Sequence, residues 1–329
     1  MTRLFRGLLT AAALAVAWSG TSAFSPAAKV IKVALQDGGT AAWEAAAMQE
    51  LKLDLHHGVK LVIRAVADSA AAQAALQAGN VDIILSDFIW VSAQRDLGAD
   101  FTFVPHALAM GGLMVAPGGP VAAVADLQGK TLAVAGGPVD SSYLILQAYY
   151  TKMTGADLTA DSQAEFGAPP MVSELLAGGG AQASLNLWQF NTRAKIAGAV
   201  ELISVKDMLA ELGVSQQPPL LGWVFSEKTA RKKQDAVKRY LDASFDTKAA
   251  LMTDDALWKK IRPLMKADDD AVFIALRDAY RAGIVAGYTD ADILAATEAF
   301  AVLAAVDGSD QIGDTPALAE GTFWAGYRR

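Results

Sequence analysis

Short apolar runs alternate with helix-like segments along the first third of the chain. The runs lie at residues 30–35, 59–66, 81–86, 101–105 and 113–116. Their β-branched residues and flanking turn residues predict strands, and the segments that start near Thr40 and Ser69 predict helices between them. Strands that are apolar almost throughout and alternate with helices indicate a mainly parallel sheet covered on both faces. We expect the strand at 113–116 to complete this first unit.

A second unit of the same kind begins after Pro120. Its predicted strands lie at residues 131–135, 164–167 and 181–185. Residues 76–86 (LQAGNVDIILS) align with residues 176–186 (LAGGGAQASLN), because each segment reads as helix end, glycine turn, apolar strand and small polar residue. Such a repeat predicts two similar α/β lobes in tandem. One more strand is expected at 220–225, and from residue 229 onward the pattern is that of amphipathic helices.

The first residues have the layout of a secretory signal. Two arginines precede an uncharged run at residues 7–17, and small residues at 21–23 form a triplet of the kind that a signal peptidase recognises. We therefore predict a signal peptide at residues 1–28 and a mature protein in the periplasm. A second stretch without Asp, Glu, Lys or Arg, residues 101–125, is broken by prolines and glycines. No membrane-spanning helix or stable membrane insertion is therefore expected in the mature chain.

Cysteine is absent from the whole sequence. Its absence excludes disulfides, thiolate nucleophiles, zinc–thiolate sites and a lipid anchor on cysteine, so we expect a free periplasmic protein and not a lipoprotein. The formal net charge of −7 is unfavourable for binding nucleic acid. A chain of 329 residues is long enough for two domains that rest on their own cores.

Two motifs are specific enough to indicate a family. Residues 75–83 (ALQAGNVDI) stand before a Ser86-Asp87 strand end, and residues 124–134 (VADLQGKTLAV) are similar to a "DLKGKxxAV" entry into a second lobe. On these motifs the chain resembles the periplasmic solute-binding proteins of nitrate/taurine/sulfonate-type ABC importers, and also binders of thiamine-precursor pyrimidines. One departure stands at residues 178–182 (GGGAQ), where the family has a Val-Asp pair.

The resemblance implies a type II periplasmic binding fold. In that fold two lobes, each a mixed, mainly parallel sheet flanked by helices, are joined by two hinge strands and close on ligand by rigid rotation. We assign residues 29–115 and 222–329 to lobe 1 with its C-terminal helices, and residues 116–221 to lobe 2. The hinges are expected at 113–117 and 220–224. The implied partners are a small-molecule ligand and the permease subunits of an ABC importer, and a monomer is expected.

Candidate ligand contacts follow from the rule that open α/β sheets bind beyond the carboxyl ends of their strands. The rule selects Gln36, Asp37 and Gly38; Ser86, Asp87 and Trp90; Gly137, Asp140, Ser141 and Ser142; Asn186, Trp188 and Gln189; Trp223; and, one helix turn further on, Trp43. Ser141 and Ser142 could equally act as plain helix caps. A single tryptophan is more often part of a core, but four of them near strand ends predict that at least two line the pocket.

The charges of these segments indicate the kind of ligand. Asp37, Asp87 and Asp140 are present, and neither Arg nor Lys occurs in the adjoining loops. A pocket for a bare sulfonate or nitrate would usually offer a basic residue, whereas acids beside tryptophans suit an amine or a nitrogen heterocycle. We therefore expect a neutral, cationic or zwitterionic organic solute. A small sulfonate or another organic anion is the alternative.

An enzyme, a metal-binding module and a sensor are the alternative classes of protein. An enzyme on the same fold is disfavoured, because the sequence has no G-x-S-x-G, P-loop or H-E-x-x-H motif and its histidines fit structural roles. A metal-binding module is conceivable if Asp37, Asp87 and Asp140 converge, although their spacing matches no known loop. A sensor that delivers ligand to a receptor stays open. We expect no catalytic residue, no metal and no cofactor.

Overall fold

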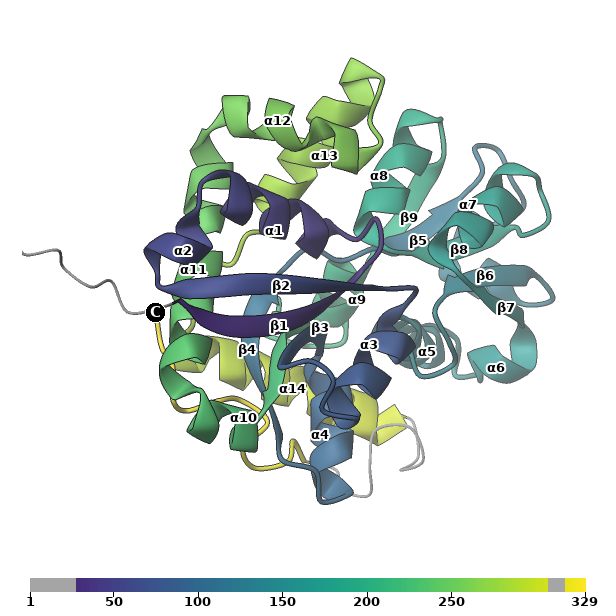
Figure 1. Cartoon of the computed structure of the whole chain (residues 1–329). Coiled ribbons are helices and arrows are strands. Elements are labelled where there is room, and N and C mark those ends of the chain that lie inside the picture. Colours follow the sequence, from purple (N-terminus) through teal and green to yellow (C-terminus); the bar gives the residue numbers. More distant parts are fainter. Residues whose placement is uncertain (1–27, 307–316) are drawn as a thin grey trace, which may run out of the picture.

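The computed structural model describes residues 28–306 and 317–329, and the predicted signal peptide lies almost wholly outside them. Two five-stranded sheets form two lobes that lie side by side (Figure 1). The first sheet has the order β2 (Val59–Val66), β1 (Lys29–Gln36), β3 (Ile83–Asp87), β10 (Leu221–Ser226) and β4 (Phe101–Ala107). The second has the order β7 (Gln163–Gly167), β6 (Thr131–Ala135), β8 (Ala183–Asn186), β5 (Gly112–Val115) and β9 (Val200–Ser204).

The two sheets are built alike. In each sheet the first three strands are parallel, and the fourth runs antiparallel to both of its neighbours. The fourth strand is β10 in lobe 1 and β5 in lobe 2. Each of these strands directly follows a segment that connects the lobes. The mixed, mainly parallel sheets predicted from the apolar runs are thus present.

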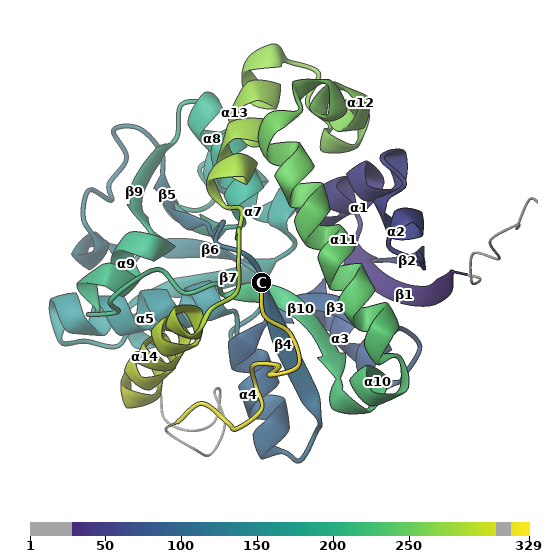
Figure 2. The ribbon, with the colours of Figure 1, turned by 90° about the vertical axis from the view of Figure 1, so that its left-hand side faces the viewer.

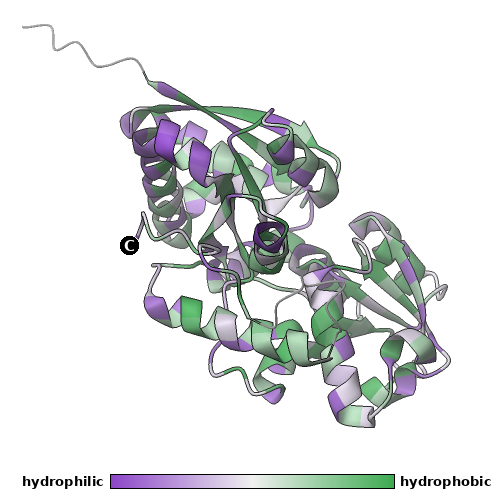
Figure 3. Cartoon of the chain, turned by 90° about the horizontal axis from the view of Figure 1, so that it is seen from below, coloured by the Kyte–Doolittle hydropathy of each residue, from purple (hydrophilic) through white to green (hydrophobic). Residues whose placement is uncertain are grey.

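Helices cover both sheets. Lobe 1 carries α1 (Thr40–Glu50), α2 (Leu53–His56), α3 (Ser69–Gln77), α4 (Phe88–Asp96), α10 (Glu227–Lys232), α11 (Gln234–Thr253), α12 (Asp255–Met265) and α13 (Asp270–Ala282). Lobe 2 carries the 3-10 turn η1 (Val124–Leu127) and α5 (Ser141–Thr154), α6 (Leu158–Asp161), α7 (Pro169–Ala177), α8 (Trp188–Ile196) and α9 (Val205–Glu211). The strands are mostly hydrophobic and the outer helices mix both kinds of residue (Figure 3). In the described residues no helix is both long and apolar enough to span a bilayer.

The prediction that the strand at 113–116 completes the first unit is wrong. Leu113 pairs with Leu185 on one side and with Ile203 on the other, so β5 is an inner strand of the second sheet. The chain therefore crosses between the lobes at residues 108–111, before the predicted hinge, and returns at residues 212–220, before β10 pairs in the first sheet. An apolar run is compatible with an inner strand of either sheet. The pattern of residues 113–116 therefore could not show which strands this run pairs with.

The assignment of residues 222–329 to lobe 1 also needs a correction. The last helix, α14 (Asp290–Val306), packs against α5 of lobe 2 (Figure 2). The Glu298 carboxylate accepts hydrogen bonds from the backbone N–H and the hydroxyl of Ser215, 2.8 and 2.6 Å away. The final residues return to lobe 1, where Tyr327 donates to Asp242 on α11.

The internal repeat explains the departure from the family motif. Gly79 and Gly179 occupy equivalent turns with φ of +70° and +74°, a conformation that favours glycine. The Asp82 carboxylate accepts the backbone N–H of Lys32 at 2.9 Å, and the Gln182 side-chain oxygen accepts that of Thr131 at 3.0 Å. Gln182 thus takes the place of the family's aspartate in tying the central strands together.

We predict that Asp82→Ala lowers the free energy of unfolding by about 2 kcal/mol, because it removes both this acceptor and the partner of Lys233, whose ammonium lies 2.9 Å from the carboxylate. Gln182→Ala should cost about 1 kcal/mol, since it removes a neutral hydrogen bond only. Chemical denaturation measures both values. Equal losses in the two variants would contradict the stated difference.

Candidate functional site

Two acidic side chains, one from each lobe, lie close enough for the charge of Asp87 to act on Asp140. The carboxylate of Asp87, at the end of β3, accepts the backbone N–H of Trp90 at 2.7 Å and caps α4. The carboxylate of Asp140 accepts the N–H groups of Ser142 and Tyr143 at 2.9 and 3.3 Å and caps α5. Burial raises the pKa of Asp87. Burial, together with the charge of Asp87, raises the pKa of Asp140 to about 6.

The neighbours of these acids are turn and helix-start residues. Gln36 is half-buried at the end of β1, whereas Asp37 and Gly38 are exposed in the turn that follows. Gly137, Ser141 and Ser142 are half-buried around the start of α5. The prediction that these residues contact a ligand stays a prediction.

Ser86 and Asn186 make hydrogen bonds within their own lobes. The hydroxyl of Ser86 accepts from the Gln73 side chain of α3 at 3.2 Å. The Asn186 amide donates to the carbonyl of Pro169 and to the Ser173 hydroxyl at 2.9 and 3.1 Å. Both residues lie at equivalent strand ends and tie each strand to the preceding helix. Gln189 is buried in α8.

The four candidate tryptophans divide into two pairs. Trp43 of lobe 1 and Trp188 of lobe 2 meet edge to face, with ring centroids 6.0 Å apart. Trp90 and Trp223 pack inside lobe 1. The ring of Trp90 stacks on Phe101 at 5.4 Å, and the Trp223 indole lies 4.6 Å from His106 and donates to the Ser244 hydroxyl. Only the first pair therefore lies where the lobes touch.

A buried polar cluster stands beside this contact. The carboxylate of Glu44, which is 1% exposed, accepts from the Ser244 hydroxyl at 2.6 Å and from the Tyr280 hydroxyl at 3.0 Å. His106 Nδ1 lies 3.6 Å from the same carboxylate. Lys248 is also buried. We call these five residues the Glu44 cluster.

Burial dominates the electrostatics of the Glu44 cluster. It raises the pKa of Glu44, which the charge of Lys248 partly offsets. It holds the pKa of His106 well below its usual value, so the imidazole is neutral at pH 7. It also lowers the pKa of Lys248 to about 8, which leaves the ammonium mainly charged at neutral pH.

A small, partly open cavity adjoins the cluster. Its volume is about 10 Å³, which is the space of a single water molecule. Its walls are formed by Thr40, His106, Ala107, Ala109, Trp188, Lys248, Tyr280, Gly283 and Ile284. Because Trp188 belongs to lobe 2 and most of the other residues to lobe 1, the cavity is closed by the meeting of the lobes.

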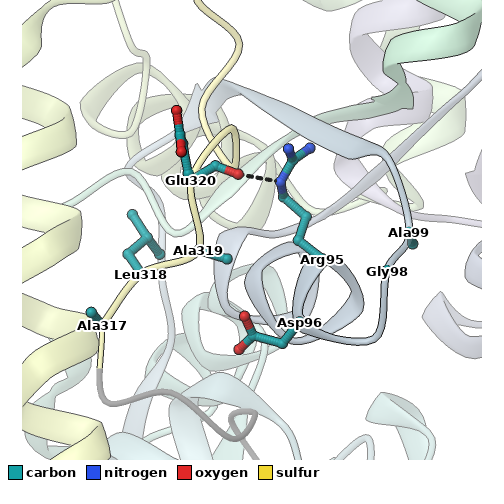
Figure 4. A pocket seen from close by; sticks show the side chains of 8 residues that line it. All are labelled: Arg95, Asp96, Gly98, Ala99, Ala317, Leu318, Ala319 and Glu320. Atoms are coloured by element: carbon teal, nitrogen blue, oxygen red, sulfur yellow. Dashed lines mark hydrogen bonds between the residues drawn. The ribbon is translucent and has the colours of Figure 1, made fainter.

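A larger open hollow of about 420 Å³ lies elsewhere, at the far end of α4 (Figure 4). Its central side chain is Arg95, whose guanidinium donates to the carbonyl oxygens of Phe101 and Glu320 and pairs with Glu227 at 3.1 Å. The arginine is thus engaged in tying the C-terminal segment to lobe 1. In the described part of the chain no three Asp, Glu, His or Cys side chains come together as a metal site.

Sequence reasoning selected none of the five members of the Glu44 cluster as site residues. His106 was assigned a structural role, and the helices that carry Ser244, Lys248 and Tyr280 were interpreted as amphipathic surface helices. A signal was present, because Lys248 falls on the same helix face as Leu241 and Leu251, which are buried. A lysine in an apolar stripe indicates a buried partner.

The family model described as NMT1/THI5 like matches residues 56–254. The match spans more than half of the chain, which therefore belongs to the NMT1/THI5-like family. Comparison with curated proteins gave no match.

Solved structures confirm the predicted two-lobed fold. The alkanesulfonate-binding protein SsuA from Xanthomonas axonopodis pv. citri, bound to MOPS, is 18% identical with a TM-score of 0.72, over 91% of this chain and 98% of that one. The periplasmic aliphatic sulphonate binding protein SsuA from Escherichia coli is 18% identical with a TM-score of 0.66, over 86% and 96%. The periplasmic nitrate-binding protein NrtA from Synechocystis PCC 6803 is 9% identical with a TM-score of 0.60, over 76% and 69%.

These neighbours bear out the resemblance found in the sequence. They are alkanesulfonate-binding and nitrate-binding proteins, and their fold has the two lobes that the apolar runs and the repeat predicted and the binding-protein architecture that the resemblance implied. At such low identity the likeness concerns the fold, and the ligand has to be argued from this chain's own residues.

We predict that Asp140→Asn stabilises the protein at pH 7 by about 2 kcal/mol. A carboxyl whose folded pKa is about 6 is harder to ionise in the folded state than in the unfolded chain, so ionisation costs stability as pH rises from about 4 to about 6. Asparagine keeps the helix cap without that cost. The gain, measured by denaturation at several pH values, should therefore vanish as pH falls to 4.

The matched control is Asp157→Asn, which replaces the exposed cap of α6. It should produce no comparable gain at pH 7. A gain for Asp140→Asn that is independent of pH would contradict the assignment to carboxyl ionisation.

Proposed function

We propose that the protein is the extracytoplasmic solute-binding component of an ABC importer. The family and the fold support this function, because the solved neighbours include a periplasmic aliphatic sulphonate binding protein and a ligand-binding component of an ABC-type import system. In this proposal the protein works in the periplasm, carries its solute to the permease subunits as a monomer, and acts as a binder without catalysis or cofactor.

The ligand is proposed to bind between the lobes, and the Asp87–Asp140 pair is the observation that carries this placement. Each carboxylate caps a helix of its own lobe, so their positions relative to each other depend on how the lobes meet. Burial and, after it, the charge of Asp87 raise the pKa of Asp140. A group placed between them that relieved this repulsion would therefore favour the closed arrangement.

We propose a neutral, cationic or zwitterionic solute, as the acids in the strand-end loops suggest. An ammonium group between Asp87 and Asp140 would replace repulsion by attraction at both carboxylates. Trp43 and Trp188, which touch each other in this structure, would offer apolar and π surfaces to the body of the solute. A small sulfonate or another organic anion is the alternative ligand.

The first test is a thermal-shift screen of the mature protein with amines, amino acids, pyrimidines, nitrate and simple alkanesulfonates. A ligand at 100 times its Kd should add about 2.7 kcal/mol to the free energy of unfolding. We expect hits among the amines, amino acids or pyrimidines. Tight binding of nitrate or a simple alkanesulfonate with no competition from an amine would contradict the proposed ligand class.

Calorimetry then tests the carboxyl pair. At pH 5.5 a cationic hit should release up to about one proton on binding, because it lowers the pKa of an Asp140 that is about 6 in the free protein. Titrations in buffers of different ionisation enthalpy measure the proton count. Asp140→Asn should abolish the release, and an unchanged release in that variant would place the ligand's charge elsewhere.

A further inference from the structure

One face of the first sheet is bare at its outer edge. The edge strand β2 pairs with β1 (Figure 1). On one side of this pair, exposed side chains follow one another along both strands, because paired residues and every second residue point to the same face. These side chains, which we call the basic strip, are Val30 and Lys32 on β1 and Lys60, Val62 and Arg64 on β2.

The helix that covers this face of the sheet lies further along the strands. Ala34 pairs with Ile84 of β3, so Ser86 of the same strand also belongs to this face. The Gln73 side chain of α3 donates to the Ser86 hydroxyl at 3.2 Å, which places α3 over the face at this point. Ala34 is accordingly 1% exposed, whereas Val30 at the start of β1 is 43% exposed. The helix itself carries no charged residue and therefore adds no acid beside the strip.

The positive charges of the basic strip have no counter-charge in the protein. Within the described residues none of its three basic side chains forms an ion pair, although two lysines beside the strip do. The Lys29 ammonium lies 3.2 Å from Asp235, and that of Lys233 lies 2.9 Å from Asp82. The whole chain has a formal net charge of −7, so the strip is a local exception in sign. It favours a partner that brings negative charge.

A second copy of the chain fits this edge poorly. In a two-fold antiparallel pairing of β2 with itself, centred on Val62, Lys60 would stand opposite Arg64 of the second copy. Like charges directly opposite each other destabilise a strand pair, and lysines on edge strands are a common means of preventing such pairing. The strip thus favours an anionic surface over another strand.

We propose that the basic strip docks the protein on a membrane surface that contains anionic phospholipids. Its basic side chains would contact the lipid phosphates, and its two valines, 43% and 39% exposed, would lie against the boundary between headgroups and acyl chains. Each basic residue near such a surface strengthens binding about fivefold. Three of them give a reversible, peripheral contact without insertion, which would keep the carrier close to the membrane in which permease subunits lie.

Docking through the basic strip leaves the proposed ligand site free. Val30 precedes Gln36, the last residue of β1, by six residues, which corresponds to about 20 Å along the strand. Arg64 is closer to the strand ends, but its strand β2 lies two strand spacings, about 10 Å, from β3, which carries Asp87. The docking surface and the ligand site can therefore be tested separately.

The experiment is a flotation assay of the mature protein with vesicles made of equal parts phosphatidylglycerol and phosphatidylcholine, at low ionic strength. Vesicles of phosphatidylcholine alone are the control. We expect binding to the anionic vesicles only, and its loss at about 0.5 M salt, because salt screens contacts between exposed charges. Absence of binding to the anionic vesicles, or equal binding to both kinds, would overturn the proposal.

Variants then locate the contact. Replacement of Lys32, Lys60 and Arg64 together by glutamine should weaken vesicle binding about 100-fold, at about fivefold per residue. The double variant Lys60→Gln with Arg64→Gln, which changes β2 alone, should weaken it about 25-fold and serves if the triple variant folds poorly.

The matched control removes the same amount of charge elsewhere. Lys206→Gln, Lys232→Gln and Lys259→Gln together change three exposed lysines of α9, α10 and α12. Binding should stay within about twofold of the unmodified protein, because these side chains lie outside the strip and distant exposed charges are screened. A loss as large as that of the strip variant would show that net charge alone drives binding, and the proposal would then be wrong.

Further outcomes distinguish other occupants of the strip. Displacement of the protein from the vesicles by soluble glycerol phosphate would assign the strip to a free anion. A dimer in sedimentation equilibrium that the triple glutamine variant abolishes would assign it to a second copy. Either result would overturn the membrane proposal.

The docking surface and the importer function can also fail independently. The thermal-shift response to solutes should be the same in the triple glutamine variant and in the unmodified protein. Solute hits without vesicle binding would remove the docking surface and leave the proposed function standing. Vesicle binding without any solute hit would leave the docking surface standing and count against the proposed function.

Discussion

Burial of the Glu44 carboxylate is the constraint on which the arrangement of lobe 1 depends. A carboxylate that is 1% exposed loses its hydration, so its protein partners must replace the lost interactions with water. Without those partners the buried charge would cost several kcal/mol. Those partners come from β4, α11 and α13, which are far apart in the sequence. The interactions that stabilise the Glu44 side chain of α1 thus hold the C-terminal helices against the first sheet. This place lies directly beside the contact with lobe 2.

The two lobes have similar folds, and even individual hydrogen bonds are equivalent between them. The side chains of Asp82 and Gln182 accept backbone N–H groups of β1 and β6, and Ser86 and Asn186 form hydrogen bonds with the helices that precede them. The lobes differ in the C-terminal helices that pack on them. Lobe 1 receives α10 to α13, whereas α14 crosses back to α5. The chain therefore passes between the lobes through more segments than the two hinges that were predicted, which restrains how the lobes can rotate.

The sequence predicted the fold well, because buried parallel strands appear in it as apolar runs and the internal repeat shows the same pattern in both lobes. It placed β5 in the wrong lobe because an apolar run of four residues carries no information about its neighbours. It found the aspartates at the strand ends, since strand ends can be located from the runs. It could not find the charge interaction of Lys248 with Glu44, because that interaction joins residues about 200 positions apart and depends on how the helical layer folds back.

Two features of the structure cost free energy. Asp87 and Asp140 repel each other, and within the described residues the Lys248 ammonium and the Trp43 indole N–H have no hydrogen-bond acceptor. Both costs arise where the lobes meet, because Asp140 and Trp188 come from lobe 2 and their counterparts from lobe 1. Since a ligand shifts a conformational equilibrium only by its differential affinity for the two states, a solute that relieved either cost would favour the arrangement in which the lobes meet.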